Sequence, residues 1–315
     1  MATLSETFVK PQAQTAPSRD LSLRQLAWRK LTRNRAAMFG LVLLGLLSAY
    51  IIIGSFVFSE EYANHNDLSI RLQPPSMEHP FGTDPIGRDI LARTIYGGQI
   101  SLVIGLASVA ISLVVGVLVG AFAGYYGGTV DSLLMRFTEA VLNIPSLFLL
   151  IIAAKYMGDK IHNFSLLGRE FSGSLIVIIL IIGLTSWMYL ARIVRSEFLS
   201  LKEREYITAA RALGVKNFRI IFRHVLPNTT APIIVAATLG IATAILSEAY
   251  ISFLGLGVRA PTATWGNMLE DATRYIENAP QIWFFPGLLI LITVLAINFV
   301  GDGLRDALDP RTLAK

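Results

Sequence analysis

The sequence predicts an all-α polytopic membrane protein, and two features of the chain support this fold class. Hydrophobic residues make up 53% of the 315 residues and charged residues only 16%, whereas a soluble globular chain carries about 25% charged residues. Apolar stretches recur along the chain, each near the roughly 20 residues with which a helix crosses the hydrocarbon core. Although the length would allow two soluble domains, this continuous pattern favours one membrane domain.

A polar segment precedes the apolar stretches. Residues 1–20 are rich in proline, glutamine, threonine and alanine, and they predict a disordered tail. Residues 21–36 predict a basic amphipathic helix that lies in the lipid headgroup plane. A basic stop that flanks the first span is the alternative, and both interpretations can hold. The polar segment is too long to be the start of a cleaved signal peptide.

Six transmembrane helices are predicted, and the third is the least regular. Polar residues interrupt its first half at Arg136, Glu139, Asn143 and Pro145, so a re-entrant segment is the alternative. Losing this span would move every later segment to the other side of the membrane, including the basic segment 193–230, and we therefore favour six spans. The predicted spans are residues 37–58, 100–124, 133–154, 174–192, 231–254 and 282–301.

The positive charges predict the orientation of the chain. With the N-terminus inside, 19 of the 27 Lys and Arg residues fall in cytoplasmic segments, as the positive-inside rule requires. The N-terminus, segment 193–230 and the tail 302–315 are therefore predicted in the cytoplasm, and the loop 59–99 outside. We expect a multi-pass protein of the cell (plasma or inner) membrane. Because topology accounts for the basic balance, nothing indicates nucleic acid as a partner.

A charged amphipathic segment, residues 203–228, stands between the fourth and fifth spans, and we name it the docking hairpin. An apolar stripe at helical spacing predicts a first helix from Tyr206 that ends at Gly214, where a helix C-cap favours a left-handed residue. A second stripe begins at Val215 and is predicted to end at Pro227, because proline cannot continue the helical hydrogen bonds. A compact hairpin of this kind predicts a docking surface.

The docking hairpin resembles the cytoplasmic EAA loop of ATP-binding-cassette importer permeases, in which EAA is followed by three residues, a glycine, nine residues and I-x-L-P. Two positions depart from that pattern, because Thr208 stands in place of the glutamate and His224 in place of the isoleucine. Glu205 lies nearly one helical turn before Thr208 and is a candidate for the acidic group. The residues that the resemblance assigns to coupling with an ATPase are Glu205, Tyr206, Ala209, Ala210, Gly214, Val215, Lys216, Leu226 and Pro227.

Three further strings extend the resemblance over roughly residues 20–311. They are HPFGTDPIGRDILARTIYGGQISL at 79–102, SFLGLG at 252–257 and GDGLRDALDPR at 301–311. By these strings the chain resembles the C-type permease subunit of dipeptide/oligopeptide (peptide/nickel) importers. The resemblance implies a transmembrane domain, residues 37–301, that forms half of a translocation path for dipeptides or oligopeptides. It also implies a second, B-type permease subunit, two ATP-binding subunits that bind ATP and magnesium, and an external solute-binding protein.

Two carboxylates within the apolar spans, Glu139 and Glu248, are candidates for the translocation path. A charge at bilayer depth costs at least about 2–3 kcal/mol, so such groups face a bundle interior or a wet path. Glu248 and its neighbour Ser247 either line that path or form a buried hydrogen bond between helices, and both interpretations stay open. For Glu139 a pairing with Arg136 is favoured over a place in the path.

A glycine stripe in the second span predicts close helix packing. Gly116, Gly120 and Gly124 lie four residues apart, and small residues on one face let helix backbones approach within the bilayer. A pore-lining role is the alternative.

The external loop 59–99 is rich in proline and glycine, which predicts an ordered element leading into a short helix at 89–96. The resemblance suggests an outer gate or a contact with the solute-binding protein, while a folded cap over the span ends is the alternative. The candidate residues of this loop are Gly82, Asp84, Gly87, Arg88 and Asp89.

Nothing in the sequence indicates bond chemistry. Cysteine is absent, which excludes disulfides, zinc–thiolate sites and cysteine nucleophiles. No G-x-x-x-x-G-K-[S/T] loop offers a site for a nucleotide phosphate, and the four histidines show neither metal-ligand spacing nor a hydrolase motif. We therefore predict no catalytic residue, metal site or cofactor on this chain, so the energy for transport must come from another subunit.

Two functions of other classes compete with an ATP-driven importer. An ion-coupled secondary transporter would need ionisable groups at the midplane and broken helices in two matching halves, which the sequence does not show. A scaffold subunit without transport would leave the docking hairpin unexplained. Within the importer class, nickel or another small solute is the alternative to peptides.

Overall fold

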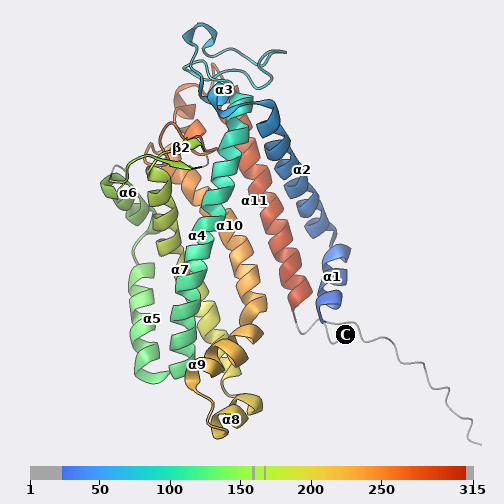
Figure 1. Ribbon diagram of the computed structural model, residues 1–315, viewed down its shortest axis with the longest axis vertical. Helices are drawn as coiled ribbons and strands as arrows, with labels where there is room; N and C mark the ends of the chain where they lie inside the picture. The colour runs from blue at the N-terminus through green and yellow to red at the C-terminus, as the bar shows by residue number, and fades with distance from the viewer. Residues whose placement is uncertain (1–22, 158–159, 167, 310–315) are drawn as a thin grey trace, which may run out of the picture.

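The computed structural model describes residues 23–157, 160–166 and 168–309, so the predicted tail at 1–20 lies outside the described residues. The described chain is mostly helical, which confirms the all-α membrane fold class (Figure 1). Its helices are α1 (Leu23–Arg33), α2 (Arg35–Val57), α3 (Glu60–Asn64), α4 (Ile90–Tyr126), α5 (Gly128–Leu142), α6 (Ser146–Met157), α7 (Ser174–Leu201), α8 (Glu205–Ala212), α9 (Asn217–Arg219), α10 (Thr230–Phe253) and α11 (Gln281–Leu308).

Short elements complete the chain. Strands β1 (Phe164–Leu166) and β2 (Arg169–Phe171) form an antiparallel hairpin between α6 and α7. Single 3-10 turns lie at Leu68–Ile70, Leu226–Thr229, Asn267–Leu269 and Ala272–Arg274, and a π-helical turn lies at Ile220–Val225.

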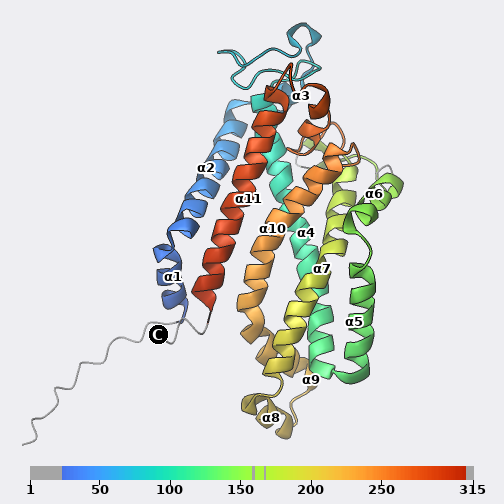
Figure 2. The same ribbon diagram turned by 180° about the vertical axis from the view of Figure 1, so that it is seen from behind.

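The long helices stand side by side in one bundle (Figures 1 and 2). The helices α4 and α7 pack against each other, α10 packs on both, and α2 pairs with α11. We name the end that carries α3 and the β-hairpin the α3 end, and the end that carries α8 and α9 the α8 end. By length and composition, α2, α4, α7, α11 and the helical run Asn217–Phe253 are each able to cross a membrane.

The third predicted span is bent. It consists of α5 and α6, which meet at an angle of 80° across residues 143–145. Pro145 has no backbone N–H and disfavours helix at the residue before it, which explains a break at this point. The pair connects α4 at the α8 end with α7 at the α3 end (Figure 1), so it crosses the bundle as one broken span and brings the number of spans in the described chain to six.

The second span is longer than the sequence predicts. The expected short helix at 89–96 and the span 100–124 form one continuous helix of 37 residues, α4. Asp89 caps it, because its Oδ1 accepts a hydrogen bond from the Ala92 N–H at 2.7 Å. Gly98 lies inside this helix, where the missing side chain makes room for a neighbour: a Cβ there would lie 2.6 Å from the Trp265 ring.

The prediction that Pro227 ends the second helix of the docking hairpin is wrong. The chain stays helical from Asn217 to Phe253, and the π-helical turn widens the backbone just before the proline, with the Leu226 N–H donating to the Ile221 carbonyl. A widened turn relieves the clash of the proline ring with the carbonyl one turn earlier. The His224 carbonyl accepts a hydrogen bond from Asn228 Nδ2 at 2.6 Å.

Two helices run past their predicted ends. The fourth span continues to Leu201 and the sixth to Leu308, so residues 302–308 of the predicted tail are helical. At the other terminus, Asn34 separates α1 from α2 and caps α2 by accepting a hydrogen bond from the Ala37 N–H at 3.1 Å. Leu31 of α1 packs against Ala37 and Ala307. The contact of α1 with lipid headgroups remains a prediction.

Candidate functional site

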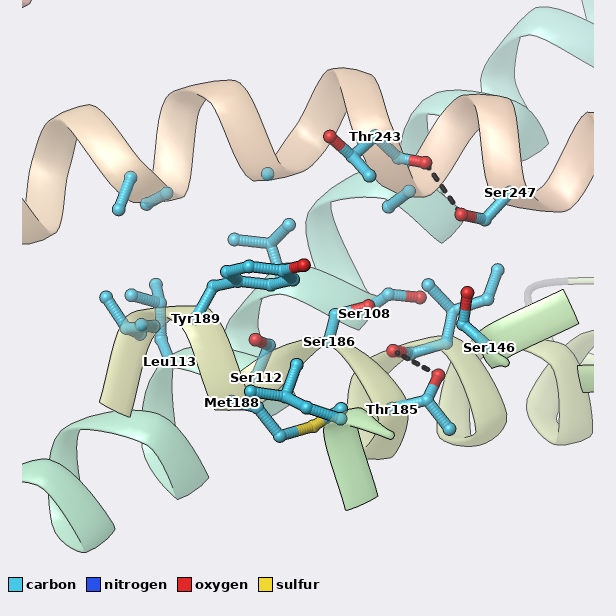
Figure 3. Close-up of a pocket in the computed structure, with 18 of the residues that line it drawn as sticks. Ser108, Ser112, Leu113, Ser146, Thr185, Ser186, Met188, Tyr189, Thr243 and Ser247 are labelled. Carbon is cyan, nitrogen blue, oxygen red and sulfur yellow. Dashed lines mark hydrogen bonds between the residues drawn. The ribbon is translucent and has the colours of Figure 1, made fainter. Parts of the chain in front are cut away.

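A cavity of about 650 Å³ lies between α4, α6, α7 and α10 (Figure 3). Its wall combines aliphatic side chains with hydroxyl groups, and Thr243 and Ser247 on α10 face the side chains that α4 and α7 contribute. Among the residues that the structure describes, no charged side chain lines it. The hydroxyl-bearing residues of the wall are Ser108, Ser112, Ser146, Thr185, Ser186, Tyr189, Thr243 and Ser247.

Half of these hydroxyl groups donate to backbone carbonyls. Thr185 Oγ1 donates to the Ile181 carbonyl at 2.7 Å and Ser247 Oγ to the Thr243 carbonyl at 2.9 Å, each one helical turn back. Thr243 donates in the same way, and Ser108 Oγ donates across to the Ile179 carbonyl of α7 at 3.2 Å. A hydroxyl that donates its proton keeps lone pairs that accept hydrogen bonds. The wall is therefore uncharged and mostly apolar, with hydroxyl oxygens that can accept hydrogen bonds.

The candidate path residues divide between three environments. Ser247 lines the cavity. Glu248 points away from it and is 1% exposed, with its Oε1 accepting hydrogen bonds from Ser252 at 2.6 Å and Thr264 at 2.7 Å. Its Oε2 has no hydrogen-bond partner within the described chain. The carboxylate thus connects α10 to the loop that follows it.

Glu139 does not belong to the cavity wall. It is exposed on α5, and the ion pair with Arg136 does not occur in the described part of the chain. The ion pair that this region does form joins Asp131 of α5 to Arg195 of α7, with two hydrogen bonds of 2.5 and 2.6 Å. This pair holds the first turn of α5 on α7.

The hydroxyl-lined wall is a feature that sequence reasoning missed. Its signal is nonetheless present, since Ser108 and Ser112 are four residues apart, as are Thr243 and Ser247. Residues at that spacing lie on one face of a helix. Hydroxyl pairs on one face of an apolar span therefore mark the sides of α4 and α10 that meet in this cavity.

The glycine stripe lies where α4 crosses α7. A Cβ at Gly116 would lie 2.9 Å from the Trp187 carbonyl oxygen, and one at Gly124 would lie 2.5 Å from Phe198 Cβ. At Gly120 the added carbon would collide with the Ala191 carbonyl oxygen. None of the three lines the cavity. The two helices thus approach as closely as their backbones allow.

The docking hairpin has a buried side and an exposed side. Buried Ile207, Ile220, Ile221 and Val225 pack on α4 and α7 in a single apolar cluster. Apolar side chains also face outward: Tyr206 is 46% exposed, Leu213 84% and Phe218 67%. Gly214 has a φ of +76° and ends α8. Of the other predicted coupling residues, Glu205, Ala209, Lys216 and Pro227 are exposed, Val215 and Leu226 half-buried and Ala210 buried.

Such exposed apolar groups on a compact element are typical of an interface. Next to them, the hydroxyl of Tyr125 at the end of α4 donates to Asn217 Oδ1 at 2.9 Å. The guanidinium carbon of Arg211 lies 5.2 Å from the centre of the same ring. The hairpin is therefore packed on the bundle from one side and open on the other.

The candidate loop residues form a compact turn at the α3 end. Asp84 Oδ1 accepts hydrogen bonds from the backbone N–H of Ile86 and of Arg88, and its Oδ2 accepts one from Arg88 Nε at 2.6 Å. Asp89, which caps α4, pairs with His79 at 2.8 Å. Both Gly82 and Gly87 have positive φ angles, so the turn needs glycine there.

The turn is also packed onto α11. The rings of Phe81 and Phe285 stack with centroids 3.9 Å apart, and Gln281 Nε2 donates to the Gln73 carbonyl at 3.1 Å. The turn therefore joins the α3 ends of α4 and α11.

Comparison with known proteins gives consistent matches. Residues 116–314 match the family described as binding-protein-dependent transport system inner membrane component, and residues 22–75 match the N-terminal transmembrane domain of oligopeptide transport permease C. The dipeptide transport system permease protein DppC of Alkalihalophilus pseudofirmus is 40% identical over 98% of this chain and 97% of its own length. The oligopeptide transport system permease protein OppC of Haemophilus influenzae is 39% identical over 92% and 89%.

Solved structures show the same fold. An inward-facing structure of the MetNI methionine ABC transporter matches with a TM-score of 0.52 and 20% identity, covering 68% of this chain and 94% of that chain.

Proposed function

Since the chain belongs to the dipeptide/oligopeptide permeases among the binding-protein-dependent transport system inner membrane components, we propose that it forms half of the path through which an ATP-driven importer moves dipeptides or oligopeptides. Membership makes it a membrane permease subunit of an ABC importer and not itself a catalyst.

The observation that carries the peptide assignment is the chemistry of the cavity wall. Its hydroxyl groups offer hydrogen bonds to amide N–H and carbonyl groups, which every peptide has whatever its side chains. A wall without charge lets a zwitterion pass without being held by a strong ion pair. Weak, side-chain-independent contacts suit a path for many peptides, and they leave selectivity to the solute-binding protein.

The competing substrates and mechanisms fit the wall less well. Metal ions such as nickel favour imidazole, thiolate or carboxylate ligands, and the cavity wall offers hydroxyls and aliphatic groups. An ion-coupled transporter needs ionisable groups at the path, whereas Glu248 is buried away from the cavity and Glu139 is exposed on α5. Both features favour the importer of peptides.

The docking hairpin would carry the energy input. Its exposed apolar residues Tyr206, Leu213 and Phe218 provide a surface on which an ATP-binding subunit can bury area. ATP and magnesium would bind to two such subunits, and the α8 end and both termini would then lie in the cytoplasm. A B-type permease subunit would supply the other half of the path, and a solute-binding protein would dock at the α3 end.

Reconstitution tests this function. The chain, its B-type partner and the ATP-binding subunits are placed in proteoliposomes, and uptake of a labelled dipeptide is measured with the solute-binding protein outside. The proposal expects uptake that requires ATP, both ATP-binding subunits and the binding protein. Uptake that persists without those subunits and follows a proton or sodium gradient would contradict it.

A further inference from the structure

The side chain of Tyr125, the penultimate residue of α4, touches both arms of the docking hairpin. It is 6% exposed. Its hydroxyl donates to Asn217 Oδ1 at 2.9 Å, where α9 begins, and its ring lies 5.2 Å from the guanidinium carbon of Arg211 on α8. One aromatic residue therefore contacts the two helices that Gly214 separates.

This contact differs in kind from the rest of the hairpin's packing. Ile207, Ile220 and Ile221 bury apolar surface against the cluster around Phe198, and burial of that sort has no preferred direction. Within the described chain, the Tyr125–Asn217 bond is the only side-chain hydrogen bond that joins the hairpin to α4 or α7. Because a hydrogen bond depends on angle as well as distance, it sets the orientation of the hairpin on α4.

The helix that carries Tyr125 forms a close-packed pair with α7. The glycine contacts at Gly116, Gly120 and Gly124 leave no space between the two backbones, and close-packed interfaces move as units. The pair contributes Ser108 and Ser112 from α4, together with Thr185, Ser186 and Tyr189 from α7, to the cavity wall. A movement that reaches the end of α4 therefore reaches one whole side of the cavity.

The opposite side of the cavity connects to the hairpin differently. Helix α10 continues from the hairpin through the π-helical and 3-10 turns at Ile220–Val225 and Leu226–Thr229. Such irregular turns inside a long helix are typical of hinges. The hairpin thus meets α10 through a bendable covalent link, and it meets the α4–α7 pair through the short connection 202–204 from α7, the apolar cluster and Tyr125.

We propose that Tyr125 is the positioning residue that fixes the docking hairpin to the α4–α7 pair, so that displacement of the hairpin by an ATP-binding subunit moves that side of the cavity relative to α10. This inference rests on the proposed function, and it adds the contact through which movement enters the cavity wall. Without this hydrogen bond the hairpin still binds the ATP-binding subunit. However, it can rotate on its apolar packing against α4 and α7, so part of its displacement no longer reaches the cavity wall.

The test compares coupling in the assembled transporter. Tyr125→Phe keeps the ring and removes the hydroxyl, and the expected result is unchanged assembly and ATP hydrolysis with about 2- to 10-fold less peptide taken up per ATP, the range for loss of one neutral hydrogen bond. Asn217→Ala should give the same loss, and the double variant should lose no more than either single variant. Tyr126→Phe is the matched control, because its side chain is half exposed and no hydrogen bond of its hydroxyl occurs in the described chain.

A second measurement needs no transport. The chain contains no cysteine, so the pair Val130→Cys and Arg219→Cys places spin labels at two chosen exposed sites, one on α5 beside the end of α4 and one on α9. In an assembled complex whose other subunits lack cysteine, we expect one narrow distance distribution. Adding Tyr125→Phe should broaden it, and adding Tyr126→Phe should not.

The outcomes separate this inference from the proposed function. If the unmodified complex shows no ATP-dependent uptake, the proposed function fails, and the spin-label distances alone decide on Tyr125. If the unmodified complex transports peptide and Tyr125→Phe retains both its uptake per ATP and its narrow distance distribution, Tyr125 does not position the hairpin. Additive losses in Tyr125→Phe and Asn217→Ala would also overturn the inference, because they would show that the two residues act apart.

Discussion

Glu248 of α10 accepts a hydrogen bond from Thr264 at 2.7 Å, and this bond joins a membrane-crossing helix to the loop that follows it. The carboxylate is buried, and Gly266 passes so close that a Cβ there would lie 2.7 Å from Oε2. A carboxylate in the bilayer region is usually a candidate for a transport path. Here the carboxylate stabilises the contact between α10 and the loop that follows it, and it does not line the cavity.

These hydrogen bonds of Glu248 predict how variants at this position and at Thr264 behave. Glu248→Gln keeps Oε1 as the acceptor and replaces the carboxyl group by an amide of the same shape, so folding and uptake should stay near those of the unmodified chain. Thr264→Val removes the hydrogen bond to Glu248 and the one that Thr264 Oγ1 accepts from the Asn267 N–H, and it should lower the unfolding free energy by about 1–3 kcal/mol. Thermal unfolding in detergent and uptake by proteoliposomes check both. A Glu248→Gln variant that folds normally but no longer transports would place the carboxylate in the path after all.

The contact between α4 and α7 predicts a sharp contrast between two glycines. In Gly120→Ala the methyl group would collide with the Ala191 backbone, and overpacking of this kind costs about 1–3 kcal/mol. Gly45 on α2 has nothing within 4 Å of the corresponding position, so Gly45→Ala should be neutral or slightly stabilising. The yield and thermal stability of the purified chain measure the difference. Equal behaviour of the two variants would contradict the described packing.

The cavity wall predicts which hydroxyl groups matter for transport. Thr243→Val and Ser247→Ala remove hydrogen-bonding groups that face the cavity, and each should lower peptide uptake about 2- to 10-fold while ATP-binding subunits still assemble. Thr238→Val is the control on the same helix, because Thr238 donates to the Ile234 carbonyl at 2.9 Å and does not line the cavity. If Thr238→Val lowers uptake as much as the other two, the cavity is not the path.

The exposed side of the docking hairpin predicts the effect of a single charge. Leu213→Glu places a carboxylate on a side chain that is 84% exposed, so the chain should insert and fold normally. Burying that charge against an ATP-binding subunit is costly, and co-purification of the subunit should fall at least about tenfold. Ile276→Glu, at a side chain 58% exposed in the loop that precedes α11 at the α3 end, is the control. Normal co-purification with Leu213→Glu would exclude this surface as the docking site.

Much of the fold follows from local patterns. Hydropathy marks the crossing segments, Gly214 ends α8 as its position predicts, and the polar residues around Pro145 mark the bend between α5 and α6. Prediction of the element ends was poorer. Helix α4 begins after its cap Asp89 and runs without a break through Gly98, where the sequence predicted two separate helices. A π-helical turn lets the chain stay helical through Pro227, where the sequence predicted a helix end. The close approach of Gly98 to the Trp265 ring depends on a neighbour in space that no local pattern includes.

The sequence by itself determined which segments are helical and apolar, and it pointed to the docking hairpin, because hydropathy, helix caps and helical spacing are properties of neighbouring residues. The tertiary structure decided which face of each helix meets which partner. Ser247 and Glu248 are adjacent, yet one lines the cavity and the other is buried beneath a loop, since consecutive residues in a helix point about 100° apart. The rotation of each helix about its axis is set by packing such as that of Gly120 on Ala191. That packing brings hydroxyl groups from four helices into one cavity and places Tyr125 between the two arms of the hairpin.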